Sequence, residues 1–216
     1  SKSEKNQLSV TFTPKKDNQT EILIVSKNAG NLLRKSQFYE NGYGGNLRIS
    51  LTYRDKNNIE GKFEINDFRV RKAPVLAQLI SSASIIGLLD NLNGNGLLFT
   101  TIEGNFLYKK NRLSLIEGVA IGPSVGLTMS GYEKYSKKNN EVYVEGLISP
   151  IYIINGVIKS IPIIGKVLGG EKGEGVFGMA YKVEGNSKKP KVFVNPLSIL
   201  TPGAFRNIFK LDDLNK

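Results

Sequence analysis

The chain has 216 residues, with 30 Lys and Arg against 19 Asp and Glu, so its net charge is +11. It contains neither His nor Cys, which excludes Ser-His-Asp triads, Cys-His dyads, disulfides and the commonest zinc and iron sites. A hydrophobic content of 40% is enough for a core, and the positive charge favours anionic partners such as nucleic acid or acidic lipid headgroups.

The first 72 residues predict strands and one short helix. Apolar and polar residues alternate with a period of two, the pattern of a strand with one dry and one wet face. The alternation changes phase at Asp67, which predicts a bulge. Asn28 is placed to cap a short helix that ends at Gln37. The alternating runs are residues 8–13, 20–26, 47–54 and 59–65.

A helical insert is expected over residues 73–93, followed by a β-meander over 94–149. Pro74 suits the first turn of a helix that continues to Ala83, and a second short piece follows over residues 84–92. The meander reads as successive hairpins, because its apolar runs are joined by short polar links. Turn-like links lie at 54–58, 108–112, 133–140 and 186–190.

The last third of the chain is unusually apolar at its start. Residues 146–170 carry only two charges, Lys159 and Lys166, yet prolines and glycines divide the segment into pieces too short to span a membrane. We expect short helices over 150–170, apolar on most sides, that cover a core, a groove or a membrane surface. Residues 171–216 predict strands and a terminal helix. The sequence predicts no signal peptide and no membrane-spanning helix.

These elements predict one mainly β domain over residues 1–216: a long, curved, antiparallel sheet of about ten strands, rolled to form a groove. Short helices are inserted, and apolar C-terminal helices cap the sheet. An open sheet of this size with one apolar face must curl or be covered. Two interpretations stay open, a lipid-binding channel on that face or an ordinary sandwich of two packed sheets.

Several local patterns favour ordinary structural roles. The glycine-rich run at 169–178 lacks the Lys-Ser/Thr of a phosphate loop and leads into a strand, so it predicts a turn. The carboxylates fall at outward strand positions or in turns, as solvated charges do; they are Glu60, Glu64, Asp67, Glu103, Glu117, Glu171 and Glu174. Lysine pairs at 109–110, 137–138 and 188–189 lie in predicted turns, and along one edge they would form a positive rim.

Several phrases of the sequence together carry a family resemblance. They occur in a characteristic order and spacing between Phe68 and Phe209, and the upstream SKNAGNLLRKSQFYENGYGGNLRI fits the same pattern. The chain resembles the C-terminal region of the AsmA-like superfamily, most closely its YhdP-like members of alphaproteobacterial type. This version is more basic and richer in Asn than usual. The phrases are FRVRKAPVLAQLISSASIIGLLDNLNGNGLLF, GPSVGLTMSG, SPIYIINGVIKSIPIIGKVLGG, GEGVFGMAYKVEG and PKVFVNPLSILTPGAFRNIF.

The resemblance implies a bridge-type lipid transporter of a Gram-negative envelope. Such a protein is anchored in the inner membrane, extends through the periplasm and carries phospholipid along a hydrophobic groove toward the outer membrane. This chain would be its C-terminal segment, with an outer-membrane or envelope protein as a further partner, no cofactor, no metal and no catalytic residues. A groove removes the cost of about 0.8 kcal/mol for each CH₂ group exposed to water.

The candidate site residues follow from strand alternation and from the apolar segments. Two other function classes stay open: a basic interaction module that binds an acidic partner or a membrane surface, and a carboxylate-based hydrolase, which we do not expect. The sequence has no recognition-helix or RNP-like pattern, so we expect no nucleic-acid partner. We expect the groove to be lined by Phe63, Ile65, Leu127, Met129, Val142 and Val144. We expect membrane or cap contacts from Ile153, Ile154, Ile161, Ile163, Ile164, Phe205 and Phe209.

Overall fold

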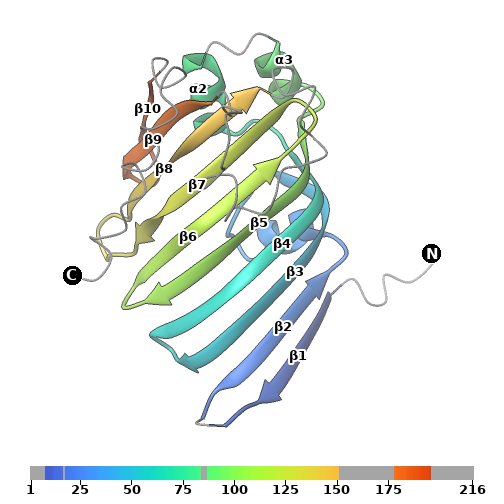
Figure 1. The fold of residues 1–216 in the computed structure, drawn as a ribbon, viewed down its shortest axis with the longest axis vertical. Helices are drawn as coiled ribbons and strands as arrows, with labels where there is room; N and C mark the ends of the chain where they lie inside the picture. The colour runs from blue at the N-terminus through green and yellow to red at the C-terminus, as the bar shows by residue number, and fades with distance from the viewer. Residues whose placement is uncertain (1–7, 17, 84–86, 151–177, 196–216) are drawn as a thin grey trace, which may run out of the picture.

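In the part of the chain that the structure describes, ten strands form one antiparallel sheet in which each strand pairs with the next (Figure 1). The structure, a computed structural model, describes residues 8–16, 18–83, 87–150 and 178–195. The predicted mainly β fold is confirmed, as one open sheet rather than two packed sheets. The strands are β1 Leu8–Pro14, β2 Thr20–Ser26, β3 Gly42–Asp55, β4 Asn58–Val70, β5 Leu97–Lys109, β6 Arg112–Ile121, β7 Val125–Lys134, β8 Glu141–Pro150, β9 Met179–Asn186 and β10 Lys191–Asn195.

The turns of five hairpins lie at one end of the sheet, which we call the hairpin end (Figure 1). The four predicted links are the turns of β3–β4, β5–β6, β7–β8 and β9–β10. At the β5–β6 turn, Lys110 and Asn111 both have positive φ, 49° and 62°. Two such residues form a turn whose twist matches that of the flanking strands, so the hairpin is tight.

The three short helices of the described residues lie at the opposite end, which we call the helix end: α1 Ala29–Lys35, α2 Pro74–Ser82 and α3 Leu88–Asn93. The predicted cap is confirmed, because the Asn28 side chain accepts a hydrogen bond of 3.0 Å from the Asn31 N–H. Helix α1 stops two residues short of Gln37, which adopts a left-handed φ of 58° and so ends the helical path. Helix α2 begins at the predicted proline.

The phase change predicted at Asp67 is confirmed, and it extends beyond one strand. Asp67 has a φ of 58°, and burial switches from odd to even positions, from Ile65 to Phe68. The predicted bulge is wrong, because the register of β4 with β3 and β5 is the same on both sides of Asp67 and no residue is added, although neither register includes Asp67 itself. Gly45, with a φ of 81°, lies opposite Asp67 on β3, and Thr100 lies opposite it on β5. The side-chain direction therefore changes phase at the same level on three neighbouring strands. We call this line across β3, β4 and β5 the crease.

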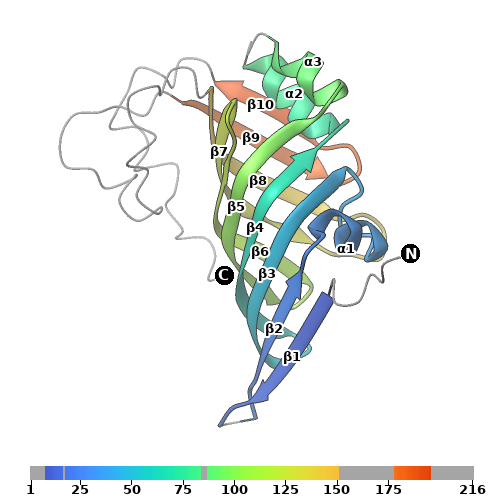
Figure 2. The ribbon, with the colours of Figure 1, turned by 90° about the vertical axis from the view of Figure 1, so that its right-hand side faces the viewer.

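The sheet is curved, and its two halves approach each other at the helix end. Helix α2, which follows β4 in the middle of the sheet, contacts the edge strand β10. Figure 2 shows the curved sheet from the side, with α2 and α3 at its upper end and α1 beside β3. A bulge in β6 adds one residue between Leu115 and Gly118 relative to β7, and bulges increase local twist.

The hydrophobic core is concentrated at the helix end. Ile80 of α2 and Leu92 of α3 are fully buried, and they belong to the same cluster as Phe68, Phe99 and Ile148 of the sheet. Helix α1 approaches β3 closely, because a Cβ added at Gly30 would lie 2.5 Å from the carbonyl oxygen of Gly42. The helical segment predicted from residue 150 does not begin there, because Pro150 is the last residue of β8. The rest of that segment, 151–170, and the predicted terminal helix lie outside the described residues.

Candidate functional site: an apolar sheet face open toward β1

The strand register gathers apolar side chains on one face of the whole sheet, which we call the apolar face. Residues directly opposite each other in an antiparallel pair point to the same side. One such row runs from Val10 through Ile24 and Ile49 to Phe63, across four strands. The apolar face comprises Leu8, Val10, Phe12, Ile22, Ile24, Leu47, Ile49, Leu51, Ile59, Phe63, Ile65, Ile102, Phe106, Leu113, Leu115, Ala120, Leu127, Met129, Val142, Val144, Ile148, Met179, Tyr181, Val183, Val192 and Val194.

Glycine allows large side chains to lie close to the backbone in the middle of this face. A Cβ added at Gly104 would lie 3.0 Å from Cε1 of Phe63 and 3.0 Å from Cδ1 of Leu115, closer than ordinary contact. The Phe63 ring and the Leu115 side chain therefore occupy the space above Gly104 that a larger residue would fill. Because Gly104 has no side chain, the surface of the apolar face lies close to the backbone at this point.

Exposure of the apolar face falls from the first strand to the ninth. On β1, Leu8 is 49% exposed and Phe12 is 64% exposed. On β9, Met179, Tyr181 and Val183 are all buried. The three described helices pack against the sheet at the helix end only, so they reduce exposure there and not along the rest of the face. The face is therefore open toward β1, and it remains half-exposed toward the hairpin end.

All six residues predicted to line a groove lie on the apolar face, in different surroundings. Ile65 and Leu127 are buried in the core. Phe63, Met129 and Val144 are partly buried and pack against it, while Val142 is half-buried near the hairpin end. The six residues do not form the most exposed part of the face. That part lies on β1, and the one available signal was that the first strand of a meander has a neighbour on one side only.

The seven residues predicted to make cap or membrane contacts lie outside the described residues. They are Ile153, Ile154, Ile161, Ile163, Ile164, Phe205 and Phe209. The glycine-rich run up to Phe177, with Glu171 and Glu174, lies outside them as well.

The opposite face of the sheet is mostly polar and holds most of the remaining carboxylate candidates. The hydrogen bond of 2.7 Å from the Arg54 guanidinium holds the pKa of the Glu60 carboxyl below its ordinary value. Glu117 accepts a hydrogen bond of 2.6 Å from Asn105. These groups interact with neighbours on an open surface. No group of three or more acidic, His or Cys side chains suited to a metal ion occurs among the described residues.

Aromatic stacking fills part of this polar face near the hairpin end. The Arg112 guanidinium carbon lies 3.9 Å from the centre of the Tyr132 ring, which stacks on Tyr143 at 5.9 Å between ring centroids. The Tyr143 hydroxyl donates a hydrogen bond to Glu145, and this bond raises the pKa of Tyr143 to about 12. The two rings stabilise β7 against β8, and each uses one flat side in doing so.

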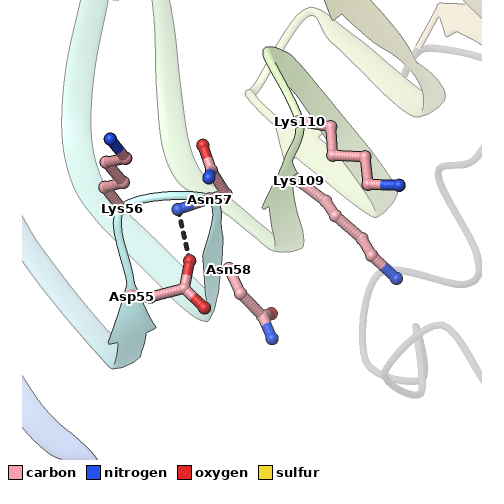
Figure 3. A pocket seen from close by; sticks show the side chains of 6 residues that line it. All are labelled: Asp55, Lys56, Asn57, Asn58, Lys109 and Lys110. Carbon is pink, nitrogen blue, oxygen red and sulfur yellow. Dashed lines mark hydrogen bonds between the residues drawn. The ribbon is translucent and has the colours of Figure 1, made fainter.

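A shallow depression of about 370 Å³ lies between two neighbouring hairpin turns (Figure 3). Its lining is polar and charged: Asp55, Lys56, Asn57, Asn58, Lys109 and Lys110. The Asp55 carboxylate accepts a hydrogen bond of 2.6 Å from the Asn57 N–H and so orders the turn. The depression is separate from the apolar face, and its lining does not suit an acyl chain.

No protein-family model, curated protein or solved structure matches this chain. None of the helices in the described ranges is long and apolar enough to cross a membrane.

Proposed function

We propose that this chain is a non-catalytic segment of a bridge-like protein that carries phospholipid between two membranes. The apolar face is the lipid path, and acyl chains lie on its exposed part from β1 to β3. One observation carries the proposal: an apolar face that crosses all ten strands stays half-exposed on the first of them, where Phe12 is 64% exposed. An apolar surface of that kind marks a binding site.

The wider setting belongs to the same proposal. The sequence phrases that resemble AsmA-like proteins of the YhdP-like type point to the periplasm of a Gram-negative bacterium, with the parent protein anchored in the inner membrane. A carrier of this kind needs no cofactor and no catalytic group, since it lowers the cost of exposing acyl chains to water. On β4, the charged residues Glu60, Lys62 and Glu64 alternate with Ile59, Phe63 and Ile65, so the two faces of this strand differ sharply.

The first test compares neighbours that point to opposite faces. Phe12→Glu with Leu51→Glu places two charges on the apolar face, whereas Thr11→Glu with Thr52→Glu places the same charges on the polar face. Each purified variant is incubated with radiolabelled phosphatidylglycerol, and the lipid retained after gel filtration is counted. We expect the first pair to lose most of the retained lipid and the second pair to keep it. Equal retention by both pairs, or none by the unmodified chain, would overturn the proposal.

A second test locates the lipid directly. A photoreactive amino acid at Phe63 or Phe12 is expected to crosslink to phospholipid, while the same group at Lys62 or Thr11 is not. Each pair is adjacent on one strand and differs in the face it presents. Crosslinking from both faces alike would indicate nonspecific lipid association.

A further inference from the structure

The hairpin end carries a dense row of exposed lysines, which we call the basic rim. The rim consists of Lys109 and Lys110, Lys137 and Lys138, and Lys188 and Lys189, which are all exposed. They come from the turns of three consecutive hairpins, β5–β6, β7–β8 and β9–β10, which lie side by side along one end of the sheet (Figure 1). Since hairpins in this order are two strands apart, their turns repeat roughly every 10 Å.

Within the described residues, the rim lysines form no ion pair with a carboxylate. The turns 109–112, 135–140 and 186–191 contain no Asp or Glu. Among the described residues, the ion pairs are Lys15–Glu21, Arg54–Glu60 and Lys182–Glu184, none of which involves the rim. Figure 3 shows Lys109 and Lys110 extending to the same side of their turn. The rim therefore presents a concentrated positive field to its surroundings.

The turns that present the lysines are ordered by their own hydrogen bonds. The Ser136 hydroxyl donates to the Asn139 carbonyl at 2.5 Å and accepts from the Asn139 N–H at 3.2 Å. The Asn186 side chain accepts from the Lys188 N–H at 2.9 Å. Because Ser and Asn satisfy the backbone, the lysine side chains are left to contact an external partner.

Tyrosines lie among the rim lysines. Tyr108 precedes Lys109, Tyr135 precedes the second lysine pair, and the two rings are 6.5 Å apart. Tyrosines beside lysines at the end of an apolar surface are typical of the boundary between lipid headgroups and acyl chains. Nucleic acid is favoured less, because a strand lying along the polar face would bring its phosphates against Glu64 and Glu103, which lie directly opposite each other there.

We propose that the basic rim docks the protein onto a bilayer that contains anionic phospholipid. The hairpin end then faces the headgroups, and the half-exposed part of the apolar face lies next to the membrane. The docking proposal depends only on the basic rim. Lipid exchange between the bilayer and the apolar face depends in addition on the proposed function. The partner is therefore a lipid surface of negative charge.

The test measures binding of the whole chain to vesicles by co-sedimentation. Vesicles of phosphatidylcholine alone are compared with vesicles of equal parts phosphatidylcholine and phosphatidylglycerol. The rim variant is Lys109→Gln with Lys138→Gln and Lys188→Gln, one lysine from each turn. The matched control removes three exposed lysines from the helix end, Lys27, Lys35 and Lys72, also by change to Gln. Circular dichroism confirms that both variants keep the β-rich fold.

We expect binding to the anionic vesicles only, with a loss of binding at high salt. The rim variant should bind roughly 100-fold more weakly, since each lysine near an anionic surface contributes about fivefold, and the control should bind nearly as the unmodified chain does. Equal loss in both variants, or no binding to anionic vesicles, would overturn the docking proposal. So would a rim-dependent complex with a single-stranded oligonucleotide in place of vesicles.

The outcomes are distinguishable from those of the lipid-path proposal. A rim variant that still retains phosphatidylglycerol in gel filtration, yet no longer sediments with vesicles, supports docking and leaves the lipid path intact. Conversely, a variant with Phe12→Glu and Leu51→Glu that sediments with vesicles normally but retains no lipid supports the lipid path and shows that docking does not depend on it. Retained lipid with no vesicle binding by the unmodified chain would overturn docking alone.

Discussion

The first strand and the helix end of the sheet have the same alternating sequence pattern but differ in side-chain burial. Leu8, Val10 and Phe12 alternate with polar residues just as Phe68 and Val70 do, yet the first three are exposed and the last two are buried. The difference comes from what covers each region. Helices α1, α2 and α3 pack over the helix end, whereas β1 is the edge strand of the described sheet and pairs there with β2 alone. Alternation therefore determines which way a side chain points, and packing partners determine whether it is buried.

The largest effect expected from this comparison is a difference between two leucines. Leu79→Ala in α2 removes a side chain that is 4% exposed and leaves a cavity, so the free energy of unfolding should fall by about 2–5 kcal/mol. Leu8→Ala makes the same chemical change at a position that is 49% exposed and should cost less than about 1 kcal/mol. Urea unfolding measures both. Similar losses would mean that β1 is covered in solution.

An intermediate effect is expected where α1 meets the sheet. Gly30→Ala places a Cβ 2.5 Å from the Gly42 carbonyl oxygen and 2.6 Å from the Tyr43 Cα, so the helix must shift away. Overpacking of this kind costs about 1–3 kcal/mol. The control is Lys35→Ala, at the exposed end of the same helix. If the two variants unfold at the same urea concentration, α1 does not cover β3 as described.

A smaller effect is expected from the cap of α1. Asn28→Ala removes the acceptor for the Asn31 N–H and should lower the free energy of unfolding by about 1 kcal/mol. Asn28→Asp keeps an acceptor in the same place and should restore most of that stability. Failure of the aspartate to do so would show that Asn28 acts through other contacts.

The last effect appears only at alkaline pH and concerns the helix end. Burial raises the pKa of Tyr39 to about 12, above its ordinary value of 10. Its contribution is fully present below about pH 10 and is lost as pH rises toward 12, because the unfolded chain ionises first. Tyr39→Phe removes this titration, so the variant should lose less stability between pH 10 and 12, by under about 2 kcal/mol. Unfolding midpoints measured at both pH values check the difference.

Local features of the fold were predictable from the sequence, because they depend on neighbouring residues. Asn28 as a cap, Pro74 at a helix start and the phase change at Asp67 each follow from short-range chemistry. The six candidate lining residues share one face because a period of two fixes their direction.

Long-range features were not predictable from local patterns. Contact of α2 with β10 depends on how far the sheet curls over six strands, and no short pattern encodes that sum. The same curl decides that Ile65 and Leu127 are buried while Phe12 is exposed. The extent of the crease was also hidden, since Gly45 and Thr100 come into line with Asp67 only through pairing.

The crease limits how far an insertion or deletion can change the direction of side chains along a strand. Inward positions are odd-numbered in β4 up to Ile65 and even-numbered from Phe68 onward, with β3 and β5 changing parity in the same row. An added or deleted residue on one side would reverse the faces of that segment only. The remaining part of each strand would keep its inside and outside, anchored by the two neighbours that share the row. The crease thus confines the effect of a register shift on side-chain direction to one part of each strand.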